Sequence, residues 1–328
     1  MAAEKIWAQR LDAPERFVRC EIDAPNPDLL ADDQVLLQTT AGGICGSDLP
    51  LYRGKISPPG SWATSEGFGK PGFPMHEVVG RVLASRHPNH RPGDRVVGWA
   101  SGCDAIAEQV VSHGDLLVGY NPDLAPEVAV LLQPLACVLY AVEQLPDPSG
   151  VHVAVLGLGP IGLLFCHVLH NAGAGRITGV DRVDRTALSD AFGINEVVHS
   201  STDRWVAGLR EADRPLFAIE AVGHQGATVN DSIHAAAEGG RVLCFGIPDD
   251  SLHALDLVAM LRKNLTVYAG VTREHSRVLA AANTYLANHP DLTRSYVTDV
   301  VEAKRVGEAF DRGCRPRAGQ VKVTITME

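Results

Sequence analysis

One stretch constrains the fold of this chain more than any other: a β-type run, VHVAVLG, that leads into GLGPIGLLFCHVLHNAG. Gly157, Gly159 and Gly162 have the spacing G-x-G-x-x-G and stand before an apolar helical segment. In such a strand–turn–helix unit the first glycine permits a tight turn, the second lets the backbone approach a pyrophosphate, and the third lets helix and strand pack closely. The helix N-terminus adds unpaired N–H groups that attract an anion. The stretch therefore predicts a dinucleotide site, with Pro160 and Ile161 in the same turn.

An acidic residue in the right place supports this prediction. Asp181 ends the next β-type run, RITGVD, about twenty residues after Gly162, the interval expected for a carboxylate that binds the adenosine ribose. The glycines alone would also fit a purely structural turn, but strand, glycines, helix and acid in this order favour a dinucleotide. A carboxylate repels a 2′-phosphate, so NAD is favoured over NADP. Arg182 and Arg185 follow closely and would soften that repulsion, and we count Arg182 among the cofactor-binding candidates.

The sequence on either side of this site predicts two domains, since 328 residues are many for a single core. Residues 148–283 alternate β-type runs with helical stretches, the pattern of parallel strands joined by crossover helices. Residues 1–147 are rich in Pro, Gly and short β-type runs, and residues 284–328 add a helical segment and an alternating strand. We assign 1–147 and 284–328 to one mostly β domain, and 148–283 to a doubly wound Rossmann domain, which makes the chain an α/β protein.

Composition and charge exclude several classes of function. A hydrophobic fraction of 45% with 21% charged residues is ordinary for a globular protein, and we expect no membrane-spanning segment. The start, MAAEKIWAQR, lacks the features of a secretory leader, so we expect a cytoplasmic protein. A net charge of −10 repels phosphate backbones, which argues against a nucleic-acid partner. Seven scattered cysteines do not predict a disulfide framework.

A second group of chemically active residues lies in the first part of the chain. Cys45, in GGICGSD, suits a core thiol, a nucleophile or a metal ligand, although a nucleophile needs a base and none is evident nearby. His76 and Glu77, in PGFPMHEVVGRV, supply a nitrogen and a carboxylate of the kinds that zinc binds alongside thiolate. An isolated His-Glu pair is more often a surface or core feature than a ligand pair, so the residues alone leave these alternatives open.

Taken together, five motifs resemble the zinc-containing medium-chain dehydrogenase/reductase superfamily, close to its alcohol, polyol and sugar dehydrogenase branches. The resemblance covers nearly the whole chain. The motifs are GGICGSD (42–48), HEVVGRV (76–82), RPGDRVVG (91–98), QPLACVLYAV (133–142) and VLGLGPIGLL (155–164). The resemblance implies a catalytic domain with a GroES-like twisted β-barrel, split in sequence around the Rossmann domain.

The resemblance also implies a metal site. By it Cys45 and His76 are catalytic zinc ligands, with Glu77 beside or on the metal. Polyol dehydrogenases carry a glutamate where this chain has Gln133, so either Glu77 or Gln133 would complete the ligand set. The four closely spaced cysteines of the family's structural zinc lobe are absent, and only Cys103 stands in that region. We therefore expect one zinc ion per chain and no structural zinc.

Other family positions carry a role or depart from the pattern. Ser47 stands where the family has a serine or threonine bonded to the substrate oxygen, so we expect it to accept the substrate proton. Met75 replaces a glycine, and Pro50 replaces a proton-relay histidine, so the proton would leave through the cofactor ribose and water or through another group. The segments that would lie against the nicotinamide follow the fourth to sixth Rossmann strands and contain Gly223, Gly246 and Val271.

These features support three hypotheses. The first is a zinc-dependent oxidoreductase that transfers a hydride between NAD and a secondary alcohol or ketone of a polyol, cyclitol or sugar, a small polar substrate. The second is a zinc-free enone or quinone reductase of the same fold, suggested by Met75, Pro50 and Gln133. The third is a non-catalytic dinucleotide-binding protein. The resemblance further implies a homodimer or homotetramer, because the last Rossmann strands often pair across a dimer axis.

Overall fold

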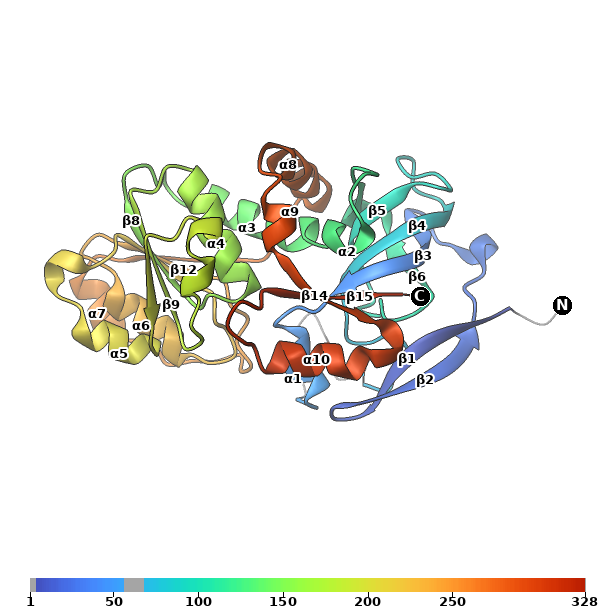
Figure 1. The fold of residues 1–328 in the computed structure, drawn as a ribbon, viewed down its shortest axis with the longest axis horizontal. Helices are drawn as coiled ribbons and strands as arrows, with labels where there is room; N and C mark the ends of the chain where they lie inside the picture. Colours follow the sequence, from blue (N-terminus) through green and yellow to red (C-terminus); the bar gives the residue numbers. More distant parts are fainter. Residues whose placement is uncertain (1–3, 56–67, 328) are drawn as a thin grey trace. The chain divides into compact units, whose positions relative to one another are not determined.

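The protein consists of two compact units, seen here in a computed structural model that describes residues 4–55 and 68–327 (Figure 1). The first unit contains Met1–Ala136, Glu274–Pro316 and Gln320–Glu328. The second contains Cys137–Arg273 and Arg317–Gly319. The chain of the first unit is thus interrupted by the second, in the order that the sequence predicts, but with different boundaries.

Most of the first unit is strand. Its strands are β1 (Lys5–Ala13), β2 (Arg16–Asp23), β3 (Gln34–Gly43), β4 (Glu77–Ser85), β5 (Arg95–Trp99), β6 (Gln109–His113), β7 (Leu117–Gly119), β14 (Val297–Glu302) and β15 (Lys322–Thr326). Its helices are α1 (Asp48–Tyr52), α2 (Pro126–Ala129), α8 (His275–Asn288), α9 (Leu292–Ser295) and α10 (Val306–Cys314), with short 3-10 turns at Pro27–Leu29, Gly114–Leu116 and Ala303–Arg305.

The main sheet of this unit brings distant parts of the chain together. Its strand order is β14-β15-β3-β4-β5-β7, with β6 also paired to β3. Antiparallel register sets Gly43 of β3 between Glu77 of β4 and Thr324 of β15. The sheet wraps around a buried apolar core that includes Leu37, Val78 and Ile325. The GroES-like fold is therefore confirmed, although β14, which runs parallel to β15, was not predicted.

Helix α8 explains why the boundaries differ from those predicted. The alternation of strands and helices assigned residues 148–283 to the Rossmann domain, but α8 packs on the first unit. Ser276 Oγ donates to the carbonyl of Asp115 at 2.7 Å, and Asn283 Nδ2 donates to that of Gly119 at 3.0 Å. The sequence pattern shows where a helix forms but not which core receives it.

The second unit is a six-stranded parallel sheet with helices. Its strands are β8 (His152–Leu156), β9 (Arg176–Asp181), β10 (Glu196–His199), β11 (Phe217–Glu220), β12 (Arg241–Cys244) and β13 (Thr266–Ala269). Its helices are α4 (Pro160–Asn171), α5 (Thr202–Gly208), α6 (Ala227–Ala235) and α7 (Leu257–Arg262), with 3-10 turns at Thr186–Leu188, Asp190–Phe192 and Glu211–Asp213, while α3 (Leu132–Glu143) crosses the boundary between the units.

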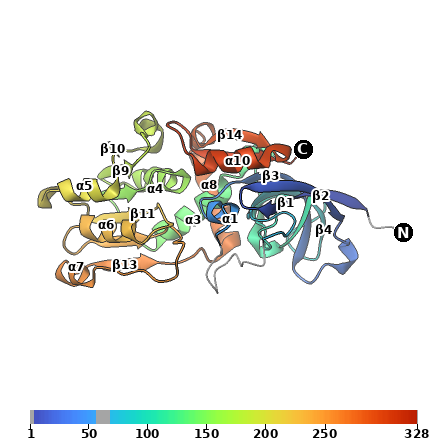
Figure 2. The same ribbon diagram turned by 90° about the horizontal axis from the view of Figure 1, so that it is seen from below.

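The strand order confirms the doubly wound fold. The sheet runs β10-β9-β8-β11-β12-β13, with every pairing parallel. Figure 2 shows β10 and β13 at opposite edges of this sheet. Numbered within the unit, the order is 3-2-1-4-5-6, in which the direction of winding reverses between the first and fourth strands. Ligands of such sheets bind at the carboxyl ends of the strands beside this reversal.

One helical stretch is long and apolar enough to cross a membrane, although the composition led us to expect no membrane-spanning segment. Pro126–Glu143 meets the length and composition required, and 56% of it is buried inside the protein. Buried core helices of soluble proteins meet the same two criteria, because a helix that is apolar all round suits a protein core as well as a bilayer.

Candidate active site

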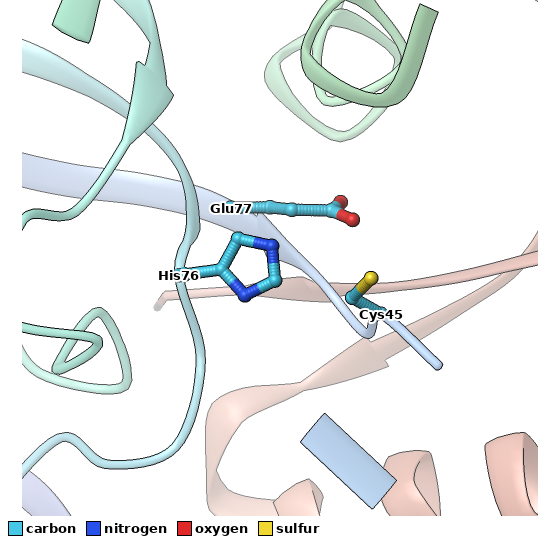
Figure 3. A group of neighbouring side chains, drawn as sticks. All are labelled: Cys45, His76 and Glu77. Carbon is cyan, nitrogen blue, oxygen red and sulfur yellow. The ribbon is translucent and has the colours of Figure 1, made fainter. Parts of the chain in front are cut away.

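Cys45, His76 and Glu77 meet at one point of the first unit. One donor atom from each lies within 4.8 Å of the other two, and Figure 3 shows the thiol, the imidazole and the carboxylate gathered at the end of β3. Across residues 4–55 and 68–327 this is the one group of three or more His, Cys, Asp or Glu side chains placed to hold a metal ion. Thiolate, imidazole and carboxylate together are a donor set that suits zinc.

Asp48 fixes two of these donors. Its fully buried carboxylate accepts a hydrogen bond from the backbone N–H of Cys45 at 3.0 Å through Oδ2. Its Oδ1 lies 3.0 Å from His76 Nδ1, which leaves Nε2 as the ring nitrogen able to bind a metal. Burial lowers the pKa of His76, but the charge and hydrogen bond of Asp48 outweigh it and hold that pKa well above its usual range. The negative charge of Asp48 would also strengthen the binding of a metal cation by His76.

Lys322 holds the third donor. Its ammonium donates to Glu77 Oε1 at 2.6 Å, and both side chains are almost fully buried, with 2% and 1% exposed. Lys322 begins β15, so the pair joins segments that lie far apart in sequence. A buried carboxylate is tolerated only with a partner of this kind.

The other oxygen of Glu77 provides a test of whether a metal fits here. Glu77 Oε2 is buried and has no hydrogen-bond partner among the described residues. Gly43 leaves the space for it, since a Cβ on that residue would lie 2.0 Å from Oε2. An unsatisfied buried carboxylate oxygen is costly, and a cation bound by Cys45 and His76 would remove that cost. The residues present therefore fit a zinc ion.

Two further predicted residues lie in the same unit. Ser47 directly precedes α1, is partly exposed, and makes no capping hydrogen bond to that helix. Gln133 is buried in the first turn of α3, where its N–H donates to the carbonyl of Val130 at 3.2 Å. Val130 approaches the site, because a Cβ on Gly43 would lie 2.5 Å from Val130 Cγ1. Gln133 therefore lies one turn of the chain after Val130, the residue that approaches Glu77.

Met75 and Cys103 have structural explanations. Met75 is fully buried, and its Cε occupies the space that a side chain at Gly42 would need, since a Cβ there would lie 2.2 Å away. Cys103 packs against Leu51 and Phe73, and burial raises its pKa to about 11. None of the seven cysteines, all of which the structure describes, forms a disulfide.

In the second unit the three glycines of the motif have three different surroundings. Gly157 has φ +94°, a left-handed conformation that favours glycine. A Cβ on Gly162 would lie 1.7 Å from the Gly157 carbonyl oxygen. A Cβ on Gly159, which precedes α4 and its first residue Pro160, would meet no atom within 4 Å. The turn is tight at the first glycine, closely packed at the third and open at the second.

Asp181 lies at the end of β9, next to this turn. Its Oδ2 accepts from the N–H of Leu158 at 2.6 Å, and its Oδ1 accepts from Val183 N–H at 2.7 Å. Arg185, considered above as a group that softens the repulsion of a 2′-phosphate, is buried and donates to the carbonyl of Arg317 at 2.9 Å. Arg182 is exposed.

The three remaining predicted cofactor residues follow adjacent strands. Gly223 follows β11, Gly246 follows β12 and Val271 follows β13, so all three lie beyond carboxyl ends of parallel strands. Gly223 has φ +67°, and Val271 is 63% exposed.

The sequence interpretation missed Asp48 and Lys322. Asp48 stands in the GGICGSD motif, but no role was assigned to it. Lys322 stands in QVKVTITM, where a lysine among alternating apolar residues gives no sign of facing a carboxylate. A charged residue within an alternating strand motif is the one available signal, because a buried charge needs a partner, but this signal does not identify the partner.

Two protein-family models match the chain. Residues 31–131 match the alcohol dehydrogenase GroES-like domain, and residues 160–285 match the zinc-binding dehydrogenase model. Together the two models cover more than half of the sequence.

Individual relatives match over nearly the full length. D-arabinitol dehydrogenase 1 of Uromyces fabae is 25% identical, with 95% of this chain and 96% of that protein covered. Among solved structures, alcohol dehydrogenase TADH from Thermus sp. ATN1 is 24% identical with a TM-score of 0.81, and covers 98% of this chain and 100% of its own. A putative zinc-binding dehydrogenase from Sinorhizobium meliloti 1021, solved with NADP, is 23% identical with a TM-score of 0.77. The match covers 99% of this chain and 100% of that structure's chain.

Proposed function

The chain belongs to the zinc-type medium-chain alcohol and polyol dehydrogenase family, and from this premise we propose that it transfers a hydride between NAD and a secondary alcohol or ketone. The substrate is a polyol, cyclitol or sugar, and one catalytic zinc ion is bound per chain. Membership of the family makes the protein an oxidoreductase. The metal, the cofactor and the substrate class are the proposal.

One observation carries the zinc assignment: Glu77 Oε2, which has no hydrogen-bond partner in the described part of the chain, belongs to the group formed with Cys45 and His76. Cys45 and His76 hold the ion, and Glu77 or Gln133 completes the set. Zinc bound there would act as a Lewis acid that lowers the pKa of the substrate hydroxyl.

The protein's own residues perform the remaining work. Asp48 holds the His76 ring with Nε2 directed to the metal position. Lys322 balances the charge of Glu77 and fixes its orientation. Ser47 Oγ accepts the proton of the substrate hydroxyl. Pro50 has no group that carries a proton onward, so Ser47 would pass its own hydroxyl proton to water and the cofactor ribose or to another group.

The glycine turn and Asp181 support NAD as the cofactor. Gly159 and the first N–H groups of α4 receive the pyrophosphate, and Asp181 accepts hydrogen bonds from the adenosine ribose. Each carboxylate oxygen has lone pairs beyond the one used by Leu158 or Val183. The structure solved with NADP is a relative, but here a carboxylate stands where a 2′-phosphate would need a cation, and the nearby Arg185 already donates to a backbone carbonyl.

The resemblance to a dehydrogenase named for D-arabinitol supports a polyhydroxylated substrate. We further propose a cytoplasmic homodimer or homotetramer. Exposed apolar side chains on α7 and after β13 support association through this edge of the second unit: Leu257, Val258, Leu261 and Val271 are 60%, 59%, 69% and 63% exposed. Light scattering would show the oligomer, and a monomer at micromolar concentration would contradict it.

The proposal is tested by measuring zinc in the purified protein and by screening polyols, cyclitols and sugars with NAD while following the absorbance of the reduced cofactor. We expect one zinc ion per chain and activity with at least one polyhydroxylated substrate. Activity in protein that holds no zinc would instead support the zinc-free reductase. Dinucleotide binding without any turnover of alcohols, ketones, enones or quinones would support the non-catalytic alternative.

A further inference from the structure

Glu220, at the carboxyl end of β11, is a buried acid that the proposed reaction does not use. It is fully buried, and its Oε1 accepts three hydrogen bonds. The donors are the backbone N–H of Val222 at 3.1 Å, that of Gly223 at 3.0 Å and the hydroxyl of Thr228 at 2.8 Å. A carboxylate in this position therefore shapes the loop that follows its own strand.

The backbone of Glu220 holds the loop after the neighbouring strand. Its carbonyl oxygen accepts from the N–H of Phe245 at 3.0 Å and from that of Gly246 at 3.1 Å. One residue thus bonds to both Gly223 and Gly246, the two glycines of the loops assigned to the nicotinamide. The loops also contact each other, since His224 N–H donates to the Ile247 carbonyl at 2.8 Å.

The space between the loops admits only glycine. A Cβ on Gly246 would lie 2.2 Å from Gly223 N and 2.7 Å from Glu220 Oε2. The loop after β11 also lies against the glycine turn, because a Cβ on Gly157 would lie 2.8 Å from Val222 Cγ2. Glu220 therefore stands at the centre of a connected backbone surface that reaches from the glycine turn to Gly246.

The position in the sheet agrees with a role in ligand binding. β11 is the first strand beyond the reversal of winding, next to β8, where doubly wound sheets bind their ligands. Glu220 Oε2 is buried and has no hydrogen-bond partner among the residues described. Burial raises the pKa of this carboxyl, against the opposing effect of the hydroxyl of Thr228 and of the backbone N–H groups of Val222, Gly223 and Gly246. The fold therefore keeps a costly group whose hydrogen bonds go to the loop after β11 and to Thr228 at the start of α6.

We propose that Glu220 is a positioning residue for the dinucleotide, which holds the loops after β11 and β12 together as one rigid support for the cofactor. The inference rests on the proposed function, because that function assigns Gly223 and Gly246 to the cofactor site. Glu220 acts through these loops and touches neither the substrate nor the reacting atoms.

The test uses the full-length zinc-loaded protein with two variants of Glu220 and one control. Glu220→Leu removes the acceptor, and Glu220→Gln keeps an acceptor oxygen. Ile219→Val, on the same strand and fully buried, removes apolar volume without removing a hydrogen bond. Binding of NADH is titrated by fluorescence, and backbone hydrogen exchange is measured in residues 221–224 and 245–247, well below each variant's melting temperature.

We expect Glu220→Leu to raise the Kd for NADH and the KM for NAD about ten- to a hundredfold, as hydrogen bonds to a charged acceptor imply. The kcat at saturating NAD and the zinc content stay near those of the wild type. Hydrogen exchange accelerates in both loops together. Glu220→Gln restores most of the affinity, and Ile219→Val leaves both readouts unchanged.

Other outcomes would overturn the inference. Wild-type affinity for NADH in Glu220→Leu would do so, as would faster exchange in residues 221–224 alone. If Glu220→Leu does not fold, Glu220→Asp replaces it, because the shorter side chain keeps the charge but withdraws the acceptor, and the same readouts apply. Wild-type protein that binds no dinucleotide would contradict the proposed function itself, whereas loss of coupling between the loops concerns Glu220 alone.

Discussion

Each unit contains a buried glutamate with one oxygen bonded and the other without a partner among the described residues, and the two differ in what surrounds them. Glu77 Oε1 is paired with the ammonium of Lys322, and its Oε2 lies in a group with a thiol and an imidazole. Glu220 Oε1 is held by neutral N–H and O–H donors, and its Oε2 faces the backbone of Gly246. The first carboxylate is open to a cation, while the second is enclosed by the loops that it holds.

The comparison shows that burial of an acid does not by itself identify a metal ligand. The neighbours of the unpaired oxygen distinguish the two acids: among the described residues, Glu77 belongs to a group of three possible metal donors, whereas Glu220 belongs to no such group. Four substitutions test whether the site around Glu77 binds a metal independently of the dinucleotide site in the second unit. We give them from the largest expected effect to the smallest.

Cys45→Ser should have the largest effect, because it removes the thiolate that we propose as a zinc ligand. We expect loss of zinc and a fall in turnover of about a thousandfold or more, since Lewis-acid polarisation contributes several kcal/mol to the barrier. NADH binding should persist, because the glycine turn and Asp181 belong to the other unit. Zinc analysis, steady-state kinetics and NADH titration check these points, and full activity in the variant would refute the ligand assignment.

Lys322→Met leaves the charge of Glu77 buried without its partner. Breaking a buried ion pair costs roughly 3–5 kcal/mol of unfolding free energy, and we expect this loss in the zinc-free protein. The zinc-loaded protein should lose less, because the cation replaces the lost ammonium charge. Denaturant unfolding with and without zinc measures both values.

A matched control removes both charges. Lys322→Met combined with Glu77→Gln should recover much of the stability of the zinc-free protein, while Lys322→Arg should be mild. An equal loss of stability with and without zinc would show that Glu77 does not face the metal.

Asp48→Asn weakens the support of the metal ligands without removing a ligand. Partners that orient a ligating histidine typically contribute ten- to a hundredfold in metal affinity, and we expect a loss of about that size. The rate at which zinc passes to a chelator measures the effect. Unchanged zinc release would show that the contacts of Asp48 to His76 and to the Cys45 backbone only stabilise the fold.

Asp181→Ala should have the smallest effect, and only in the second unit. Loss of the ribose acceptor and of the repulsion toward a 2′-phosphate should shift the ratio of kcat/KM values for NAD and NADP by about tenfold toward NADP. Zinc content should stay constant. A ratio equal to that of the wild type would contradict the contact of Asp181 with the ribose.

The fold of the second unit was largely predictable because its signals are local. The turn, the helix start and the acid lie between residues 155 and 181, where glycine spacing and strand periodicity reveal the turn and the interval after the last glycine identifies Asp181. The β-type runs predicted in 148–283 correspond to β8–β13. The membership of α8 was not predictable, because it depends on contacts with β7 and the turn before it.

The candidate metal site could be predicted only in part, because its residues come from distant segments of the sequence. Cys45, His76 and Glu77 were candidates through family motifs, and the structure brings them together. Asp48 escaped assignment because its partner His76 comes from a separate segment of the chain. Lys322 escaped assignment because β15 brings it to Glu77 of β4, and no local pattern identifies such a partner. The same holds for Met75, whose side chain fills the space left by Gly42.

The place of β15 has a consequence for the biosynthesis of the protein. This strand, which carries Lys322 and pairs with β3 beside Gly43, lies near the end of the sequence, whereas Cys45 and His76 emerge from the ribosome early. A nascent chain that lacks β15 therefore exposes the thiol and imidazole without the ammonium that steadies Glu77. If zinc is bound as we propose, the complete metal site should form only after β15 has been synthesised.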